Sequence, residues 1–396
     1  MSHARTIHLS VDDLGLFFDP SHQALAEHLR SEAVRDLSAI ESPDDSASAM
    51  GDLGLYAYLV PEPLGGAKVG KPDDATYIDV RSLVLIREAL GQISPLADAI
   101  FAVQGLGSYP IVLAGTDEQK RHYLPSVITG KRITGFGLTE PEAGSDVASL
   151  QTTATRREGA WVLDGEKTLI SNVPIAQHYV VFASADRALG RKGISAFVVE
   201  DGSTGLSFDP IPMSIPHPIG NLHLEGCRVP ESALLGAVGG GFSLAMATLD
   251  AFRISVGAAA VGMARRALAA AIEHVTTRRQ FGQKLAEQQQ VLAYLAEMAT
   301  ELDASRLLVA RAAHLRDTSG KRVSVEAAMA KMFATEAAQR IIDKAVQLHG
   351  GRGVTLGSEV EALYREIRPL RIYEGTTEIQ KLIIGKALTA GAGTKG

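Results

Sequence analysis

The spacing of hydrophobic side chains changes twice along this 396-residue chain, and these changes constrain the fold more than any other feature. Up to about residue 132, and again from about residue 240, apolar residues recur at the three- and four-residue intervals of helices. Between these stretches the interval is two, and runs rich in Val, Ile and Phe alternate with turn residues. We therefore expect an α+β multidomain protein, with a helical domain over 1–132, a β-domain over 133–237 and a second helical domain over 238–396.

Capping residues divide the helical stretches into separate helices. Ser21 is the expected N-cap of a helix over 21–40, and residues 377–380 form a capping-box pattern at the start of the last helix. The other helices are expected over 83–90, 96–113, 242–273, 288–315 and 325–349, and strands over 179–183, 194–199 and 221–224. The helix over 242–273 is rich in Ala and Gly, so neighbouring helices can approach it closely.

The segment 135–172 combines an acidic, Gly-containing loop over 140–146 with a predicted β-hairpin. Asp164 and Gly165 form the expected two-residue turn, since a type I′ turn requires positive φ at both central positions. Backbone N–H groups and short hydroxyls suit a flat, hydrogen-bonding ligand; the hydroxyls belong to Thr139, Ser145, Thr168 and Ser171. Composition alone is equally consistent with a surface meander.

Composition excludes several classes of protein. The net charge of −6 gives no general attraction to nucleic acid or to an anionic membrane. The single cysteine, Cys227, excludes an internal disulfide and a cysteine-cluster metal site. No basic-then-apolar signal pattern starts the chain and no uninterrupted apolar run approaches about 18 residues, so we expect a cytoplasmic protein without a membrane span. No His–carboxylate spacing indicates a metal site.

Two motifs carry a family resemblance. The run LTEPEAGSD at 138–146, followed by GEKTLISN at 165–172, resembles the signature of the acyl-CoA dehydrogenase flavoproteins, and the resemblance extends over nearly the whole chain. It implies a helical N-terminal domain, a middle β-barrel-like or sandwich domain and a C-terminal four-helix bundle. It further implies FAD, an acyl-CoA substrate, an electron-transfer flavoprotein as partner and a homotetramer built as a dimer of dimers.

Glu374, in the run IYEGT, is the candidate catalytic base. By itself, an acid near a helix start is explained by the helix dipole. The resemblance favours catalysis, because IYEGT matches the segment that supplies the carboxylate in most family members. Burial would raise the pKa of such a carboxylate and make it a stronger base, and N–H groups around Gly375 could bind the thioester oxygen. A minority of the family carries its base before an Arg on the long helix; here that position is Phe252, which cannot take a proton.

The resemblance also assigns the cofactor site. Phe136, Leu138, Thr139, Leu169 and Ser171 match positions around the flavin ring, with Thr139 near the pyrimidine edge and Ser171 near N5. Leu169 stands where many relatives have a stacking Trp. The segments matched to the pyrophosphate and adenosine ends, in part across a subunit interface, contain Arg278, Gln280, Phe281, Gln289, Gln347, Gly350, Gly351, Thr376 and Glu378.

Simpler explanations exist for parts of that set. Arg278 could only solvate a helix end, and the glycines of QLHGGRG could only terminate a helix. That run is not a dinucleotide fingerprint, because it follows a helix and not a strand. The carboxylate of Glu378 suits a neutral contact better than a phosphate contact.

The substrate site is assigned in the same way. Residues matched to the CoA arm are Ser145, Leu249, Asp250 and Arg253, while Ala102, Val103, Leu106 and Tyr373 are expected to line the acyl pocket. Asp250 and Arg253 lie three residues apart on a helix and could instead pair with each other. The run PMSIPHPIG at 212–220 replaces the family's Gly-x-Arg-x-Ser pattern, and within it His217, like His349, is interpreted as an ordinary polar residue.

Taken together, the sequence predicts FAD-dependent α,β-dehydrogenation of an acyl-CoA to a trans-2-enoyl-CoA. Two enzymes of the same fold are alternatives: a dehydrogenase of carrier-protein-bound acyl or aminoacyl groups, and an oxidase. A flavin-bearing binding protein associated with nucleic acid is a further alternative, against which the acidic charge balance and the intact Glu374 motif argue.

Overall fold

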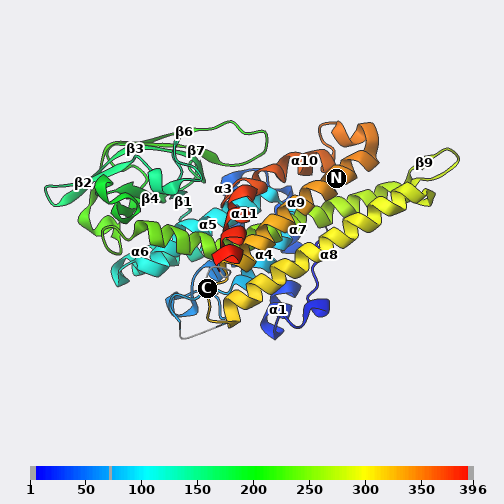
Figure 1. Cartoon of the computed structure of the whole chain (residues 1–396), viewed down its shortest axis with the longest axis horizontal. Helices are drawn as coiled ribbons and strands as arrows, with labels where there is room; N and C mark the ends of the chain where they lie inside the picture. The colour runs from blue at the N-terminus through cyan, green and yellow to red at the C-terminus, as the bar shows by residue number, and fades with distance from the viewer. Residues whose placement is uncertain (1–5, 71–73, 391–396) are drawn as a thin grey trace. The chain divides into compact units, whose positions relative to one another are not determined.

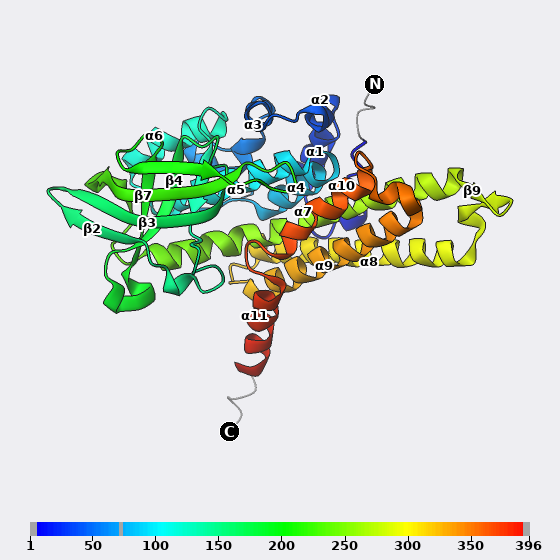
Figure 2. The same cartoon turned by 90° about the horizontal axis from the view of Figure 1, so that it is seen from above.

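The computed structural model describes residues 6–70 and 74–390 and confirms the expected order of helices, sheet and helices (Figure 1, Figure 2). The α-helices are α1 (Pro20–Leu29), α2 (Glu32–Arg35), α3 (Pro43–Asp52), α4 (Val80–Ile93), α5 (Pro95–Ala114), α6 (Asp117–Ile128), α7 (Gly241–Thr277), α8 (Gln289–Thr318), α9 (Ser324–His349), α10 (Glu359–Glu366) and α11 (Thr377–Ala390). The strands are β1 (Thr134–Gly137), β2 (Thr153–Arg157), β3 (Ala160–Ser171), β4 (His178–Ser184), β5 (Ile194–Glu200), β6 (Leu206–Pro210), β7 (Ile219–Pro230), β8 (Leu234–Leu235), β9 (Arg279–Gln280) and β10 (Gln283–Lys284).

The chain packs into two compact units, each of which is assembled from segments that are separate in the sequence. The helical unit contains Met1–Ala39, Val80–Asp98 and Arg253–Gly396, and the mixed unit contains Ile40–Asp79 and Ala99–Phe252. The division falls inside α5 and α7, so each of these helices contributes to both units. The domain boundaries expected at 132 and 237 stay predictions.

The mixed unit is built on a sheet with the strand order β6-β7-β3-β2-β4-β5-β8, to which β1 adds as a parallel partner of β4. All seven residues of β4 are buried, as their continuous apolar pattern predicts. Trp161 of β3 and Phe197 of β5 pack with ring centroids 5.2 Å apart in the core. The expected strands over 179–183, 194–199 and 221–224 are therefore confirmed.

The predicted hairpin forms, but its turn is not at Asp164 and Gly165. Arg157 pairs with Ala160, so the turn is Glu158 and Gly159, whose φ values of 47° and 72° suit a type I′ turn. Asp164 and Gly165 lie inside β3, where the register with β7 shifts. An Asp-Gly pair suits a bulge as well as a turn, since both use positive φ at glycine.

The helical unit is organised around α7, α8 and α9, which lie side by side in both views (Figure 1, Figure 2). Close approach of backbones replaces side-chain packing where α4 meets α7. A Cβ atom on Gly91 would lie 2.4 Å from the carbonyl oxygen of Ala259, and one on Gly262 would lie 2.2 Å from that of Glu88. The small residues of α7 thus serve the close helix packing that the sequence predicts.

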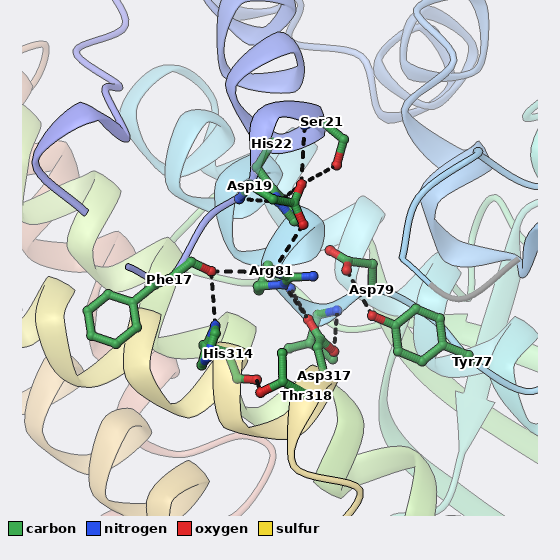
Figure 3. Close-up of polar contacts among 11 residues, drawn as sticks. Phe17, Asp19, Ser21, His22, Tyr77, Asp79, Arg81, His314, Asp317 and Thr318 are labelled. Carbon is green, nitrogen blue, oxygen red and sulfur yellow. Dashed lines mark hydrogen bonds and ion pairs between the residues drawn. The ribbon is translucent and has the colours of Figure 1, made fainter. Parts of the chain in front are cut away.

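A buried ion pair fixes the start of α4 within this unit (Figure 3). Asp317, near the end of α8, accepts hydrogen bonds from the backbone N–H groups of Val80 and Arg81 and from Arg81 Nε at 3.2 Å. Arg81 Nη1 also lies 3.3 Å from Asp19 Oδ2. One buried guanidinium therefore joins α4, α8 and the residues before α1.

Two capping predictions are wrong by one or two residues. Asp19, not Ser21, caps α1, and the helix expected over 21–40 ends at Leu29 because Ser31 adopts an extended conformation. At α11 the capping contact comes from Thr376 Oγ1, which accepts from Ile379 N at 3.4 Å. Thr377 donates its hydroxyl to Glu336 instead, at 2.6 Å.

Among the described residues, two helices, α5 and α7, have the length and hydropathy of membrane spans, although the sequence has no uninterrupted apolar run of about 18 residues. Of their most apolar windows, 89% and 78% respectively is buried inside the protein. Their apolar composition is accounted for by packing.

Candidate active site

The loop that carries Glu374 follows a short 3₁₀ helix (Arg368–Arg371) and leads into α11. Glu374 and Gly375 both have positive φ, 52° and 91°. For a glutamate this conformation costs on the order of 1–3 kcal/mol and persists only where surrounding contacts hold it. Lys331 Nζ and Gln380 Nε2 supply those contacts, donating to the carbonyl oxygen of Gly375 at 2.8 and 2.9 Å.

The Glu374 side chain points into the protein and is only 5% exposed. Its Oε1 lies 4.0 Å from Arg87 Nη1, while its Oε2 is buried without a hydrogen-bond partner among the described residues. Burial raises the pKa of this carboxyl, and the cations Arg87, Lys331 and Arg253 oppose that rise without cancelling it. The expected direction of the pKa shift is therefore confirmed, and one carboxylate oxygen is left without a partner.

Arg87, in α4, is fully buried beside this carboxylate. Its Nε and Nη2 donate to the two carboxylate oxygens of Asp98 at 2.8 and 2.9 Å, and its Nη1 donates to Ser255 Oγ at 3.0 Å. Tyr373 also shares a hydrogen bond with Arg87, and burial raises the pKa of its phenol. Because Asp98 already neutralises Arg87, the guanidinium influences Glu374 without forming a close ion pair with it.

Arg253, expected on the CoA arm, lies against the same loop. It is 6% exposed, and its Nε donates to the carbonyl oxygen of Glu374 at 3.4 Å. The backbone N–H groups of Glu374 and Gly375 make no hydrogen bond to any residue that the structure describes. The helical unit therefore brings together a carboxyl group with a raised pKa and backbone N–H groups that have no partner among the described residues. The predicted site residues Arg253, Tyr373, Glu374 and Gly375 all lie at this loop, and their roles stay predictions.

The ring-binding residues expected in the mixed unit also meet. The backbone N–H of Thr168 donates to the carbonyl oxygen of Thr139 at 3.0 Å, which joins the end of β1 to β3. Leu169 follows in a left-handed conformation, with φ of 56° and 54% of its surface exposed. Phe136 packs edge-on against Phe182, with ring centroids 5.1 Å apart, and Leu138 is buried.

This group fits a flavin ring. Within the described residues the Thr139 hydroxyl makes no hydrogen bond, and the half-exposed Leu169 presents an aliphatic surface beside it. Ser171 adds a second hydroxyl at the end of β3. The free Thr139 hydroxyl and an uncovered apolar side chain beside it suit a planar ligand with hydrogen-bonding edges.

A buried ion pair holds the acidic loop that follows Thr139. Lys167 Nζ donates to Glu140 Oε1 at 2.7 Å, and the backbone N–H of Thr152 donates to the same oxygen at 3.0 Å. Burial alone would raise the pKa of Glu140, but Lys167 and the N–H donors outweigh it and lower that pKa. Ser145, expected on the CoA arm, is exposed on this loop.

Ser171 has a partner that the sequence does not predict. Its Oγ lies 2.7 Å from His217 Nε2. His217, interpreted above as an ordinary polar residue, is thus in direct contact with a predicted cofactor residue.

The residues assigned to the pyrophosphate lie at the tip of a hairpin between α7 and α8. Gln280 pairs with Gln283 across a turn at Phe281 and Gly282, whose φ values are 52° and 80°. Phe281 is 93% exposed, and Figure 1 and Figure 2 place β9 at the far end of the α7–α8 pair from α11. Gln289 begins α8 and is also exposed. Within its own unit, the hairpin is therefore remote from the loop of Glu374.

The remaining assigned residues are spread over both units. Gln347 is exposed in the last turn of α9, and Gly350 and Gly351 follow it, exposed as well. Thr376 caps α11 as described, and Glu378 is exposed in its first turn. In the mixed unit, Ala102 and Leu106 are buried on α5 and Val103 is half-buried, while Leu249 and Asp250 are half-buried on α7.

Three residues at the Glu374 loop were not predicted: Arg87, Lys331 and Gln380. Two of them leave a signal in the sequence, since Arg87 interrupts the apolar run LVLIREAL and Lys331 stands on an alanine-rich face. Charged residues at core-facing positions are rare unless paired, which marks them as functional candidates. Gln380 leaves no comparable signal.

The chain is similar to known proteins over most of its length. Three family models match the chain: "Acyl-CoA dehydrogenase, N-terminal domain" over 16–131, "middle domain" over 135–227 and "C-terminal domain" over 239–389. The chain is 37% identical to the "Caffeyl-CoA reductase-Etf complex subunit CarC" of Acetobacterium woodii, over 88% of this chain and 90% of that protein. It is 38% identical to the human mitochondrial "Short-chain specific acyl-CoA dehydrogenase", over 92% and 89% respectively. The solved structure of butyryl-CoA dehydrogenase from Megasphaera elsdenii superposes with a TM-score of 0.86 at 32% identity, covering 94% of this chain and 99% of that one.

Proposed function

The chain belongs to the acyl-CoA dehydrogenase family, and from this premise we propose that it converts an acyl-CoA thioester to the trans-2-enoyl-CoA. As a member it is an oxidoreductase of CH–CH bonds and uses FAD. The observation that carries the proposal is the buried Oε2 of Glu374, which has no hydrogen-bond partner among the described residues.

Glu374 is the proposed base for the α-proton. A carboxylate in water is too weak for a thioester α-proton, but burial raises the pKa of Glu374 and so strengthens it as a base. Its Oε2 accepts the proton, while Lys331 and Gln380 hold the strained loop in place through the Gly375 carbonyl. The left-handed backbone thereby fixes the direction of the carboxylate without a direct hydrogen bond to it.

The free backbone N–H groups of Glu374 and Gly375 are the proposed donors to the thioester oxygen. As the α-proton leaves, negative charge moves onto that oxygen, and preorganised N–H donors stabilise it. The same loop thus supplies both the base and the electrophilic support.

FAD, when bound, accepts the hydrogen that leaves the β-carbon as hydride. Phe136, Leu138, Thr139, Leu169 and Ser171 are the proposed ring contacts. Thr139 and Ser171 would orient the ring edge through their hydroxyls, and Leu169 would cover one face.

We further propose an electron-transfer flavoprotein as the electron acceptor. The relative from Acetobacterium woodii is named as a subunit of a reductase–Etf complex, which supports this partner. A homotetramer, built as a dimer of dimers, is proposed because Arg278, Gln280 and Phe281 are exposed on a hairpin remote from the loop of Glu374. There they could reach the pyrophosphate of a neighbouring copy, with Gln347, Gly350 and Gly351 at its adenosine end. A cytoplasmic location and a role in fatty acid metabolism complete the proposal.

The relatives include enzymes named for reduction as well as for dehydrogenation, and the proposed base and flavin site of this chain would serve either direction. The alternative substrate is an acyl group bound to a carrier protein. It contains the same acyl thioester and differs from an acyl-CoA only in the group attached to the sulfur. Anaerobic titration of the yellow holoenzyme with butyryl-, octanoyl- and 3-phenylpropionyl-CoA, and with the matching acyl-carrier proteins, separates these cases. Loss of the flavin absorbance with a CoA ester is the expected result. Bleaching by a carrier-bound group alone, or by no thioester, would overturn the CoA assignment.

A further inference from the structure

His217 sits in a loop that is held rigidly against the end of β3. Prolines 216 and 218 flank it and restrict its backbone from both sides. The backbone N–H of Asn172 donates to the carbonyl oxygen of Pro218 at 2.6 Å, and Ile211 N donates to Ile219 O at 2.9 Å, closing the loop. These restraints hold His217 in place, so its 2.7 Å contact from Nε2 to Ser171 Oγ follows from the fold of the loop.

The imidazole of His217 is neutral at physiological pH. Burial lowers its pKa to about 4, and no charged side chain contributes to the shift. Among the described residues Nδ1 makes no hydrogen bond, and it is not one of the fully buried polar atoms without a partner. Water can therefore reach Nδ1, and either ring nitrogen can carry the single proton.

The two tautomers give the Ser171 hydroxyl opposite roles. If Nε2 carries the proton, it donates to Ser171 Oγ, and the hydroxyl proton of Ser171 is free to donate elsewhere. If Nδ1 carries the proton, Ser171 donates to Nε2, and its oxygen lone pairs are free to accept. The N5 atom of oxidised flavin accepts a hydrogen bond, whereas in the reduced form N5 carries a proton and donates one.

We propose that His217 is a positioning residue that orients the Ser171 hydroxyl towards flavin N5, as a donor in the oxidised state and as an acceptor in the reduced state, by exchanging tautomers through water at Nδ1. This rests on the proposed function, in which Ser171 lies at N5. Each redox state then has a complete hydrogen-bond chain from the flavin through Ser171 to His217. The segment PMSIPHPIG, which departs from the family pattern, supplies His217 as the second group in this series of hydrogen bonds.

The ¹⁵N chemical shift of N5 in holoenzyme loaded with [¹⁵N5]FAD tests the proposal, since that shift reports hydrogen bonding directly. His217→Leu removes the partner of Ser171 and is expected to move the N5 resonance in both the oxidised and the reduced enzyme. FAD should also dissociate about fivefold more readily, the effect of losing one hydrogen bond of about 1 kcal/mol. His217→Gln, whose carboxamide carries a donor and an acceptor, should restore both resonances.

The experiment distinguishes a failure of the His217 proposal from a failure of the proposed flavin site. A shift in one redox state only, or in neither, would overturn the tautomer exchange. If Ser171→Ala moves the N5 resonance and His217→Leu does not, the inference about His217 fails while the flavin placement stands. If Ser171→Ala has no effect either, Ser171 is not at N5 and the proposed flavin site itself fails.

His223 offers a matched control on β7. It is an imidazole of the same sheet and pairs with Asp209, not with Ser171. His223→Gln should leave the N5 resonance unchanged in both states. Thermal unfolding and FAD content of each variant show whether a shift comes from the site or from a disturbed fold. If the His217→Leu protein fails to bind FAD, His217→Phe, which also lacks a hydrogen-bonding group, takes its place and has the same expected result.

Discussion

Nη1 of Arg87 lies 4.0 Å from Oε1 of Glu374, while Nε and Nη2 of the same guanidinium are bound by Asp98. Glu374 thus has a cation nearby that is already neutralised by another carboxylate. This arrangement lets burial dominate, and the pKa of Glu374 stays raised. Burial therefore sets the base strength of Glu374, and the charges of Arg87 and Asp98 modulate it.

Changes to that pair should move the acid limb of the pH profile in opposite directions. Asp98→Asn keeps a hydrogen-bonding side chain but removes the negative charge that raises the pKa of Glu374, so the acid limb of kcat/KM should move to lower pH. Adding Arg87→Met to that variant removes the cation that lowers the same pKa, and the limb should return towards higher pH. Shifts of about 0.5–1 pH unit are expected for charges at such distances.

The buried pair of Arg81 and Asp317 provides the matched control (Figure 3). Asp317→Asn should lower stability without moving the acid limb. If Asp98→Asn moves the acid limb to higher pH, the charge of Asp98 does not raise the pKa of Glu374 and this explanation is wrong.

Glu374→Gln should stabilise the holoenzyme at neutral pH. Burial raises the pKa of Glu374 from its ordinary 4.5, so the folded state binds a proton more tightly than the unfolded chain. That contribution to stability is complete below the unfolded pKa and is lost as pH rises through the folded pKa. The variant cannot lose it, and its Tm should exceed that of the wild type by on the order of 2 °C at pH 7.

The same comparison near pH 4.5 should show little difference between the two proteins. Scanning calorimetry at both pH values checks this. Equal Tm values at pH 7, or a lower Tm for Glu374→Gln, would show that the carboxylate is better compensated than its unpaired Oε2 indicates.

Lys331→Met should impair catalysis although Lys331 does not touch the reacting atoms. The variant removes the donor to the Gly375 carbonyl, so the Glu374 loop is held less firmly, and kcat/KM should fall about 10- to 100-fold. Burial lowers the pKa of Lys331 to about 8, so its charge disappears near that pH in the wild type. An alkaline transition near pH 8 should therefore be present in the wild type and absent in the variant.

Lys344 lies on the same helix and pairs with Glu297 at the surface, so Lys344→Met is the control. It should retain wild-type activity and the transition near pH 8. Retention of that transition in Lys331→Met would assign it to another group.

Periodicity predicted the fold because helices and strands depend on local patterns. The helix expected over 242–273 is α7 (Gly241–Thr277), and the one over 325–349 is α9 (Ser324–His349). Turn chemistry was less reliable, since Asp164-Gly165 and Glu158-Gly159 are both suitable turn pairs and only the pairing of β3 with β2 and β7 decides between them.

The site was predictable only where a motif carries it. Glu374 and Ser171 were found through their motifs, whereas their partners Arg87 and His217 come from segments 287 and 46 residues away in sequence. Backbone strain offers a structural clue that the sequence lacks: of the five described non-glycine residues with positive φ, Leu169, Phe281 and Glu374 are predicted site residues. No local sequence pattern predicts a left-handed backbone conformation at a leucine or a phenylalanine.

The role of Glu374 as the base is tested most directly by the exchange of the α-hydrogens of a bound acyl-CoA with deuterated solvent, measured by NMR on FAD-loaded wild type and Glu374→Gln. We expect exchange in the wild type and a loss of about 100- to 10,000-fold in the variant, with FAD still bound. Exchange at an unchanged rate in Glu374→Gln would show that another group removes the α-proton, and the central role assigned to Glu374 would be wrong.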